Sequence, residues 1–237
     1  MALPKINETL NFNMKVPSTG KTVKYRPYLV KEEKILLQAF ESGDVKTCLE
    51  AMVSTLDACI DPKSKVEVGS LATFDIEYLF TQVRAKSVGE SSRILIKCKG
   101  CGEDNPQDIN LEDLKVEVEK NDNVIDINDE LSVEMKYPTY NSFIEQDINV
   151  DNQDTESLFA MLASSISAVL TENERIACEK ESKESVVEFL NSMTASQLQK
   201  VVSFLEKLPA LKHEVKFDCS KCGEHNEIEL KGLSDFF

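Results

Sequence analysis

The sequence has few of the residues on which most catalytic and phosphate-binding sites depend. It contains no tryptophan, two histidines and eight glycines among 237 residues. Ser-His-Asp and Cys-His sites need a general base beside the nucleophile. A phosphate-binding loop needs several closely spaced glycines. With His213 expected at the start of a strand, in a packing role, and no glycine-rich run, the sequence predicts a protein that is not an enzyme.

Basic residues are also scarce relative to acidic ones. The chain has 27 Lys and Arg against 42 Asp and Glu, a formal net charge of -15. Nucleic acids and anionic membranes are bound through basic faces, so this balance argues against both as general partners. No apolar run approaches the roughly 20 residues of a membrane span, and residues 1–5 lack the layout of a signal peptide. We therefore expect neither nucleic acid nor a membrane as a partner.

The cysteines do not have the pattern of a secreted disulfide scaffold. There are seven, an odd number. Cys48, Cys59 and Cys178 stand in apolar, helix-like surroundings and are expected to be buried free thiols. This usage fits a reducing cytosol. The remaining four cysteines form two Cys-x-x-Cys pairs.

The two pairs belong to one longer pattern that occurs twice. Residues 98–102 read Cys-Lys-Gly-Cys-Gly and are called knuckle 1 here; residues 219–223 read Cys-Ser-Lys-Cys-Gly and are called knuckle 2. An alternating, strand-like run precedes and follows each knuckle. An asparagine, Asn105 or Asn226, is the third residue after each knuckle's last glycine. The pattern predicts the same β-hairpin used twice, with a Cys-x-x-Cys loop at each tip.

Four thiolates from two such loops make a complete tetrahedral ligand set for zinc. The predicted metal ligands are therefore Cys98, Cys101, Cys219 and Cys222. Iron accepts the same ligands, and unmetallated thiols or redox-active pairs are the alternatives. Because four cysteines leave no open coordination position, we expect a structural site with Zn as its cofactor.

The first 90 residues favour a hairpin followed by three helices. Residues 10–16 and 22–25 alternate apolar and polar around a turn at 17–20. Helical patterns follow, and they cover residues 30–40, 45–56 and 73–89. Gly43 is expected to end the first helix and Asp44 to cap the second, whose apolar residues from Val45 to Leu56 predict one buried face.

The middle of the chain predicts a small sheet and then helices. Residues 114–118, 124–127 and 131–137 alternate, with turn residues between them and Pro138 at the end of the sheet. Helical patterns run from 139 to about 146, from 154 through Ile166, from 182 or 185 through 190, and from 194 through 205. Thr194 and Gln197 form a capping box. Residues 171–178 fit a tight turn as well as a strand.

The fold class predicted is α+β, with helical lobes around small antiparallel hairpins and a zinc-ribbon-like pair of knuckles. Four sections are expected, and they join as one integrated domain. They are an N-terminal hairpin plus helices (1–90), the first knuckle and small sheet (91–137), a helical section (138–210), and the second knuckle with the C-terminal tail (211–237). A single zinc is expected to draw both hairpins into one ribbon-like sheet.

Three further features have ordinary explanations beside functional ones. His225, next to knuckle 2, can replace a cysteine ligand or bond to a sulfur, although four cysteines make this unnecessary. The acidic run 126–134 lacks the glycine and final glutamate of a calcium loop and is expected to be a solvated face. Phe236 and Phe237 either fold back into a core or anchor a partner.

Several stretches together resemble the T4-type bacteriophage baseplate hub family, which includes hub subunits and hub-assembly proteins. The N-terminal stretch is Tyr25-Arg26-Pro27-Tyr28-Leu29-Val30-Lys31-Glu32-Glu33-Lys34-Ile35-Leu36-Leu37. The C-terminal ones are Leu208-Pro209-Ala210-Leu211-Lys212-His213, Cys219-x-x-Cys222-Gly223 and Gly232-Leu233-x-x-Phe236-Phe237. They span nearly the whole chain in the right order, and the Arg-Pro run is the more specific.

The resemblance implies a late viral protein that acts in the host cytoplasm during tail assembly and either stays in the virion baseplate or leaves as a chaperone. It implies other baseplate hub proteins or the tape-measure protein as partners. Arg26, Lys31 and Glu32 are the expected exposed contact residues, together with Phe236 and Phe237. For the first three, the alternative is an ordinary salt-bridge cluster at a helix N-terminus.

Two other functions compete with this one. A nucleic-acid-binding zinc ribbon of regulatory function would carry basic and aromatic residues, whereas residues 224–229 are acidic. A thiol-redox enzyme would need a thiolate at a helix N-terminus, whereas both knuckles stand between strand-like runs.

Overall fold

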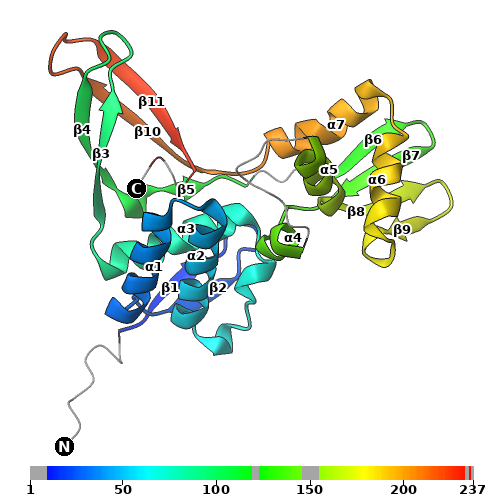
Figure 1. Cartoon of the computed structure of the whole chain (residues 1–237), viewed down its shortest axis with the longest axis horizontal. Helices are drawn as coiled ribbons and strands as arrows, with labels where there is room; N and C mark the ends of the chain where they lie inside the picture. Colours follow the sequence, from blue (N-terminus) through cyan, green and yellow to red (C-terminus); the bar gives the residue numbers. More distant parts are fainter. Residues whose placement is uncertain (1–9, 119–122, 146–154, 233–234, 236–237) are drawn as a thin grey trace, which may run out of the picture. The chain divides into compact units, whose positions relative to one another are not determined.

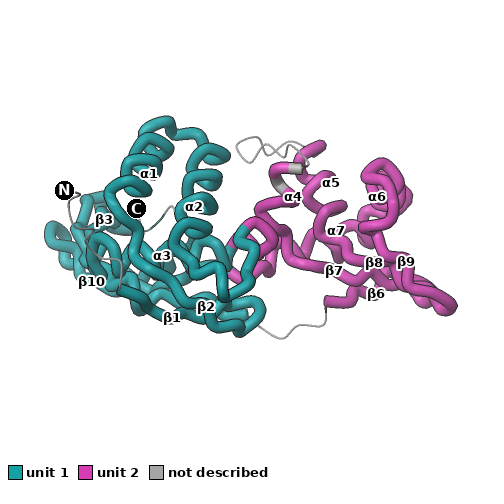
Figure 2. The backbone as a smooth tube through the Cα atoms, turned by 90° about the horizontal axis from the view of Figure 1, so that it is seen from below, with its two compact units in different colours: residues 1–68, 74–118, 210–237 teal, residues 69–73, 119–209 magenta. Residues whose placement is uncertain are grey.

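The computed structural model describes residues 10–118, 123–145, 155–232 and 235. Its α-helices and small antiparallel sheets confirm the α+β class (Figure 1). Two compact units are present, and Figure 2 colours them separately. Unit 1 combines Met1–Val68, Phe74–Val118 and Ala210–Phe237, and unit 2 combines Gly69–Thr73 and Glu119–Pro209. The division into four sections stays a prediction.

Unit 1 contains two helices from the N-terminal region, a third helix, and the strands of the knuckles. Its elements are β1 (Phe12–Lys15), β2 (Thr22–Tyr25), α1 (Val30–Ser42), α2 (Val45–Cys59), α3 (Thr73–Ser87, whose first residue belongs to unit 2), β3 (Ser91–Lys97), β4 (Asp104–Asn110), β5 (Lys115–Val116), β10 (Leu211–Asp218) and β11 (His225–Lys231), with 3-10 turns at Pro62–Ser64 and Leu111–Asp113 and a third, Val68–Ser70, where the two units meet in the sequence.

Local signals in the sequence set the ends of the first two helices. Gly43 adopts the left-handed conformation (φ 67°) that residues with a Cβ disfavour, and it ends α1. The Asp44 side chain accepts a hydrogen bond from the Thr47 N–H and caps α2. Both predictions are confirmed. The buried face predicted for α2 is confirmed only from its second turn onward, because Val45 is 36% exposed while Met52 and Leu56 are buried.

The strands that carry the knuckles lie in two separate sheets. Among the described residues, β3 pairs with β4 alone, and β10 stands between β11 and β5. The expectation of one ribbon-like sheet is therefore wrong: each hairpin keeps its own ladder, and the two lie side by side (Figure 1). β5 was expected beside the strands that follow it, but it pairs with Leu211 and Lys212 of β10. Buried Leu111 and Leu114 bring β5 there.

A shared apolar cluster joins both hairpins to α3. Ile96 and Ile109 come from the first hairpin, Val215 and Phe217 from the second, and Ala85 from α3. All five are less than 9% exposed. Alternate residues of each strand point into this cluster, as the period-two pattern requires. The bases of the two hairpins are thus held together by hydrophobic burial.

Unit 2 is a four-stranded antiparallel sheet with helices. Its strand order is β6-β7-β8-β9. The elements are β6 (Val124–Asn128), β7 (Leu131–Met135), α4 (Tyr140–Glu145), α5 (Thr155–Ser164), β8 (Ile166–Thr171), β9 (Arg175–Ala177), a 3-10 turn at Cys178–Lys180, α6 (Lys183–Asn191) and α7 (Ala195–Glu206). The core combines strand residues such as Val133 with helix residues such as Leu162, Leu190 and Val201.

The placement of Ile166 in a helix is wrong. Ile166 opens β8, and α5 ends at Ser164. The hydroxyls of Ser164 and Ser165 both bond to the carbonyl of Met161, which gives the backbone there an alternative to continued helix. The capping box of Thr194 and Gln197 is confirmed. In the described part of the chain, no helix combines the length and apolarity that crossing a bilayer requires.

Candidate metal centre

The two knuckles fold into the same tight loop. In knuckle 1, the Gly102 N–H donates to the Cys98 carbonyl at 2.9 Å; in knuckle 2, the Gly223 N–H donates to the Cys219 carbonyl at 3.0 Å. Both glycines have a positive φ, 72° and 74°, which explains why glycine stands there. The N–H of each first cysteine is also bonded back to a carbonyl, that of Glu103 or Glu224, at 2.9 Å.

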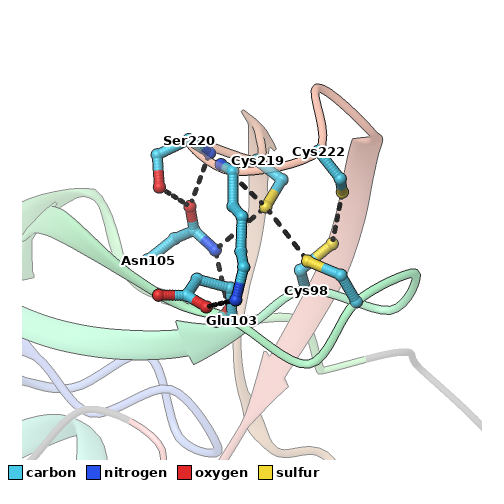
Figure 3. Close-up of polar contacts among 8 residues, drawn as sticks. Cys98, Glu103, Asn105, Cys219, Ser220 and Cys222 are labelled. Carbon is cyan, nitrogen blue, oxygen red and sulfur yellow. Dashed lines mark hydrogen bonds and ion pairs between the residues drawn. The ribbon is translucent and has the colours of Figure 1, made fainter.

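The loops bring all four predicted ligands together. The Sγ atoms of Cys98, Cys101, Cys219 and Cys222 lie within 4.8 Å of one another. Across the knuckles, Cys98 is 3.7 Å from Cys222 and Cys101 is 3.6 Å from Cys219 (Figure 3). A tetrahedral site with metal–sulfur bonds of about 2.3 Å has sulfurs about 3.8 Å apart. The two distances across the knuckles match this spacing, and the other sulfur pairs lie within 4.8 Å, so the four cysteines could hold a metal ion.

The first cysteine of each pair is buried and the second is exposed. Cys98 and Cys219 are 3% and 4% exposed, whereas Cys101 and Cys222 face solvent. Each buried sulfur accepts backbone hydrogen bonds: Gly100 N–H donates to Cys98 and Lys221 N–H donates to Cys219, both at 3.4 Å. Such donors stabilise a thiolate and orient a ligand.

Backbone N–H groups of the two loops also shift the pKa values of the thiols. The N–H groups of Cys222 and Lys221 lower the pKa of Cys219 to about 6, and the Cys101 N–H is the main group that lowers the pKa of Cys98. For Cys222, the Glu224 N–H lowers the pKa, but the neighbouring thiols, that of Cys101 first, together with partial desolvation outweigh it and raise the pKa to about 12. Four thiolates at this spacing repel one another, and a bound divalent cation would remove that repulsion.

Two buried asparagines connect the knuckles. Asn226, which follows knuckle 2, accepts a hydrogen bond from the Lys99 N–H of knuckle 1 at 2.9 Å. Asn105, which follows knuckle 1, accepts one from the Ser220 N–H of knuckle 2 at 2.9 Å (Figure 3). In the sequence these asparagines stand out as part of the repeat, but the repeat alone indicates no role for them. The signal that could have identified them is their equivalent position, three residues after the last glycine of each knuckle.

A comparison with known protein families identifies the family of the chain. The profile of the family described as T4 bacteriophage base plate protein matches residues 8–237. The chain belongs to this family. The resemblance drawn from the sequence is thereby confirmed at the level of a T4-type baseplate protein. No curated protein and no solved structure matches the chain.

In this baseplate protein, His225 follows knuckle 2 closely in the sequence, but its ring nitrogens contact carboxylates and not sulfurs. Its Nδ1 is 2.7 Å from Oδ1 of Asp218, and its Nε2 is 3.7 Å from Oε1 of Glu227. The bond to Asp218, and more weakly the charge of Glu227, raises the pKa of the imidazole. The cluster of four cysteines that could hold a metal ion does not include His225.

The expected partner contacts near α1 have two different environments. Glu32 is 4% exposed, so the expectation of exposure is wrong for this residue. Its carboxylate turns inward, where it accepts from the Leu29 N–H at 2.8 Å and from Arg26 Nη2 at 2.9 Å. The Lys31 side chain is 71% exposed, with Nζ 3.2 Å from Oε1 of Glu32. The Arg26 side chain is 25% exposed and pairs with Glu32, so the alternative of a salt-bridge cluster at the N-terminus of α1 describes both residues.

The other residues singled out in the sequence are the two C-terminal phenylalanines and the three cysteines outside the knuckles. Phe236 and Phe237 lie outside the described residues. Of the three further cysteines, Cys59 is buried while Cys48 and Cys178 are partly exposed, and all three are free thiols. The prediction of full burial is therefore confirmed only for Cys59, whose burial raises the pKa of its thiol to about 11.

Proposed function

We propose that this baseplate protein is a hub subunit or hub-assembly protein that acts through protein contacts, is not an enzyme, and carries a structural zinc ion. The family match over residues 8–237 supports the baseplate role. The closed set of four sulfurs supports a structural role for the metal, because a tetrahedral four-cysteine site leaves no position for substrate or water.

Zinc is proposed because the donor set and spacing fit it. Cys98 and Cys101 from knuckle 1, with Cys219 and Cys222 from knuckle 2, would hold the ion. Zn²⁺ with four thiolates is a standard structural site in proteins. When bound, the ion fixes the tips of the two hairpins to each other. Iron would occupy the same ligands and give a coloured protein.

The proposed partners are other hub proteins or the tape-measure protein of the tail. Arg26 and Lys31 remain contact candidates in unit 1, and so do Phe236 and Phe237. The place of action is the host cytoplasm during assembly, and then the virion baseplate if the protein is retained. Deleting residues 236–237 should abolish partner binding without lowering the melting temperature if they anchor a partner.

The test is native mass spectrometry of the tagged chain, isolated from cells that make the whole phage tail. The expected result is the chain with one zinc ion, bound to a hub or tape-measure protein. Cys222→Ser should lose the metal, whereas Cys178→Ser, a change in a free cysteine of unit 2, should keep it. A metal-free monomer without a tail partner, or a complex with nucleic acid, would contradict the proposal.

A further inference from the structure

We propose that Asn105 and Asn226 are positioning residues of the metal centre: each side-chain amide holds the opposite knuckle in place and donates a hydrogen bond to its buried sulfur. This inference rests on the proposed four-thiolate metal site. It adds a second layer of residues to that site and assigns them a measurable part in metal affinity.

The Asn226 side chain is fully buried and uses both ends of its amide. Its oxygen accepts from the Lys99 N–H of knuckle 1 at 2.9 Å. Its nitrogen donates to the Glu224 carbonyl at 2.8 Å and lies 3.5 Å from Sγ of Cys98. One amide thus contacts its own loop, the backbone of the other loop and a metal ligand of that other loop.

Asn105 repeats this arrangement in the opposite direction. It is 2% exposed. Its oxygen accepts from the Ser220 N–H at 2.9 Å and from the Ser220 hydroxyl at 3.0 Å. Its nitrogen donates to the Glu103 carbonyl at 2.8 Å and lies 3.7 Å from Sγ of Cys219 (Figure 3). Each asparagine therefore bonds to the opposite knuckle, and these reciprocal hydrogen bonds of Asn105 and Asn226 are called the asparagine lock here.

The chemistry of the position calls for a neutral amide. One end must accept from a backbone N–H, and the other must donate to a carbonyl and to a sulfur. Aspartate keeps the acceptor but turns a second negative oxygen toward the thiolate, and alanine leaves buried backbone groups unpaired. Mutating a residue that is hydrogen-bonded to a metal ligand typically weakens metal binding about 10- to 100-fold.

The asparagine lock also accounts for how ligands from distant parts of the chain meet. The hydrophobic cluster holds the bases of the hairpins. At the tips, the amides fix the backbone beside Cys98 and Cys219, the two buried ligands. The sulfurs of both knuckles are therefore brought to the spacing of a metal site by contacts that involve no metal–ligand bond.

The first experiment compares Asn105→Asp and Asn226→Asp with Asn110→Asp by zinc titration against a competing chelator. Asn110 lies at the end of β4 and is exposed, and its side-chain oxygen accepts from the Glu112 N–H, which aspartate can also do. The expected result is about 10- to 100-fold weaker zinc binding in the first two variants. Asn110→Asp should bind zinc like the wild type. Unchanged affinity in both knuckle variants overturns the inference.

A second measurement uses the wild-type chain, so it does not depend on whether the variants fold. In the protein loaded with ¹¹³Cd, scalar coupling from the metal through sulfur to the side-chain N–H protons of Asn105 and Asn226 is expected. Absence of coupling to both, with cadmium bound, overturns the hydrogen bonds to sulfur. A wild-type chain that binds neither zinc nor cadmium overturns the proposed metal site and this inference together.

Discussion

The two units of the chain reach stability by different means. Unit 2 has a four-stranded sheet, and its helices and strands share a core that includes Val133, Met135, Leu162 and Val201. Unit 1 carries its knuckles on a two-stranded and a three-stranded sheet. Two-stranded hairpins are marginally stable alone in water. Unit 2 therefore has a sheet completed by strand pairing, whereas the hairpins of unit 1 are joined by side chains and, as proposed, by a metal ion.

Loss of a proposed metal ligand should produce the largest difference in stability between the two units. Structural zinc contributes about 10 kcal/mol or more to the folding of small sites. Cys98→Ser, or chelation of the wild type, is therefore expected to expose the amides of 91–110 and 211–231 to hydrogen exchange, while 124–135 and 166–191 stay protected. Cys48→Ser is the control. Uniform loss of protection, or none, would show that the difference between the units is not real.

The converse change should weaken unit 2 alone. Leu162 is fully buried in the core of that unit, and Leu162→Ala is expected to cost about 2–5 kcal/mol. Zinc content and the hydrogen exchange of residues 91–110 should not change. Leu158→Ala, on the same helix but 38% exposed, should cost much less. Metal loss in Leu162→Ala would refute the independence of the two units.

A smaller effect is expected at the N-terminus of α1. Burial raises the pKa of Glu32, but the hydrogen bonds from Arg26, the Leu29 N–H and Lys31 lower it more, so the net shift is downward from 4.5. A lowered pKa stabilises the fold at pH above the unfolded value, and this contribution is lost as pH falls through the folded pKa. Arg26→Ala leaves a buried carboxylate short of a partner and should cost about 2 kcal/mol.

Denaturant unfolding at several pH values checks this prediction. The wild type should lose stability below about pH 4.5 more steeply than Glu32→Gln, which has no carboxyl group at this position. Lys31→Ala removes only an exposed partner and should have a smaller effect than Arg26→Ala. Equal pH profiles for the wild type and Glu32→Gln would refute the account.

The smallest effect is expected in the last helix of unit 2. The Thr194 hydroxyl accepts from the Gln197 N–H, and the Gln197 side chain accepts from the Thr194 N–H. Thr194→Ala should cost about 1 kcal/mol in thermal or denaturant unfolding. Gln199→Ala, an exposed change on the same helix, should be nearly neutral. A loss in Gln199→Ala as large as that in Thr194→Ala would argue against the capping account.

Sequence reasoning was sufficient where the signal is local. Gly43, Asp44 and Thr194 each act on the adjoining helix, and their roles are confirmed. The fold class is confirmed as well. For the metal site, the repeated spacing identified four cysteines whose sulfurs the structure brings within 4.8 Å; that they are metal ligands, and that the metal is zinc, stay predictions.

What the sequence did not reveal depends on distant partners. β5 has only two residues, and its pairing with β10 follows from the burial of Leu111 and Leu114 beside a strand much later in the chain. Ile166 fits the helical spacing that precedes it, but it pairs with Met135 of β7, a partner about 30 residues earlier in the chain. Glu32 is polar, which predicts exposure, yet three donors around its carboxylate offset the cost of burial.

The sequence separation of the paired sulfurs has a consequence for synthesis. Cys219 follows Cys101 by 118 residues, and Cys222 follows Cys98 by 124. Ribosomes add about 5–20 residues per second. Knuckle 1 therefore leaves the ribosome roughly 6 to 25 seconds before its counterpart is made, and nearly all of unit 2 emerges in between. During this interval a nascent chain offers two thiols without their partners, so stalled chains that end before residue 219 should react with thiol reagents at both Cys98 and Cys101.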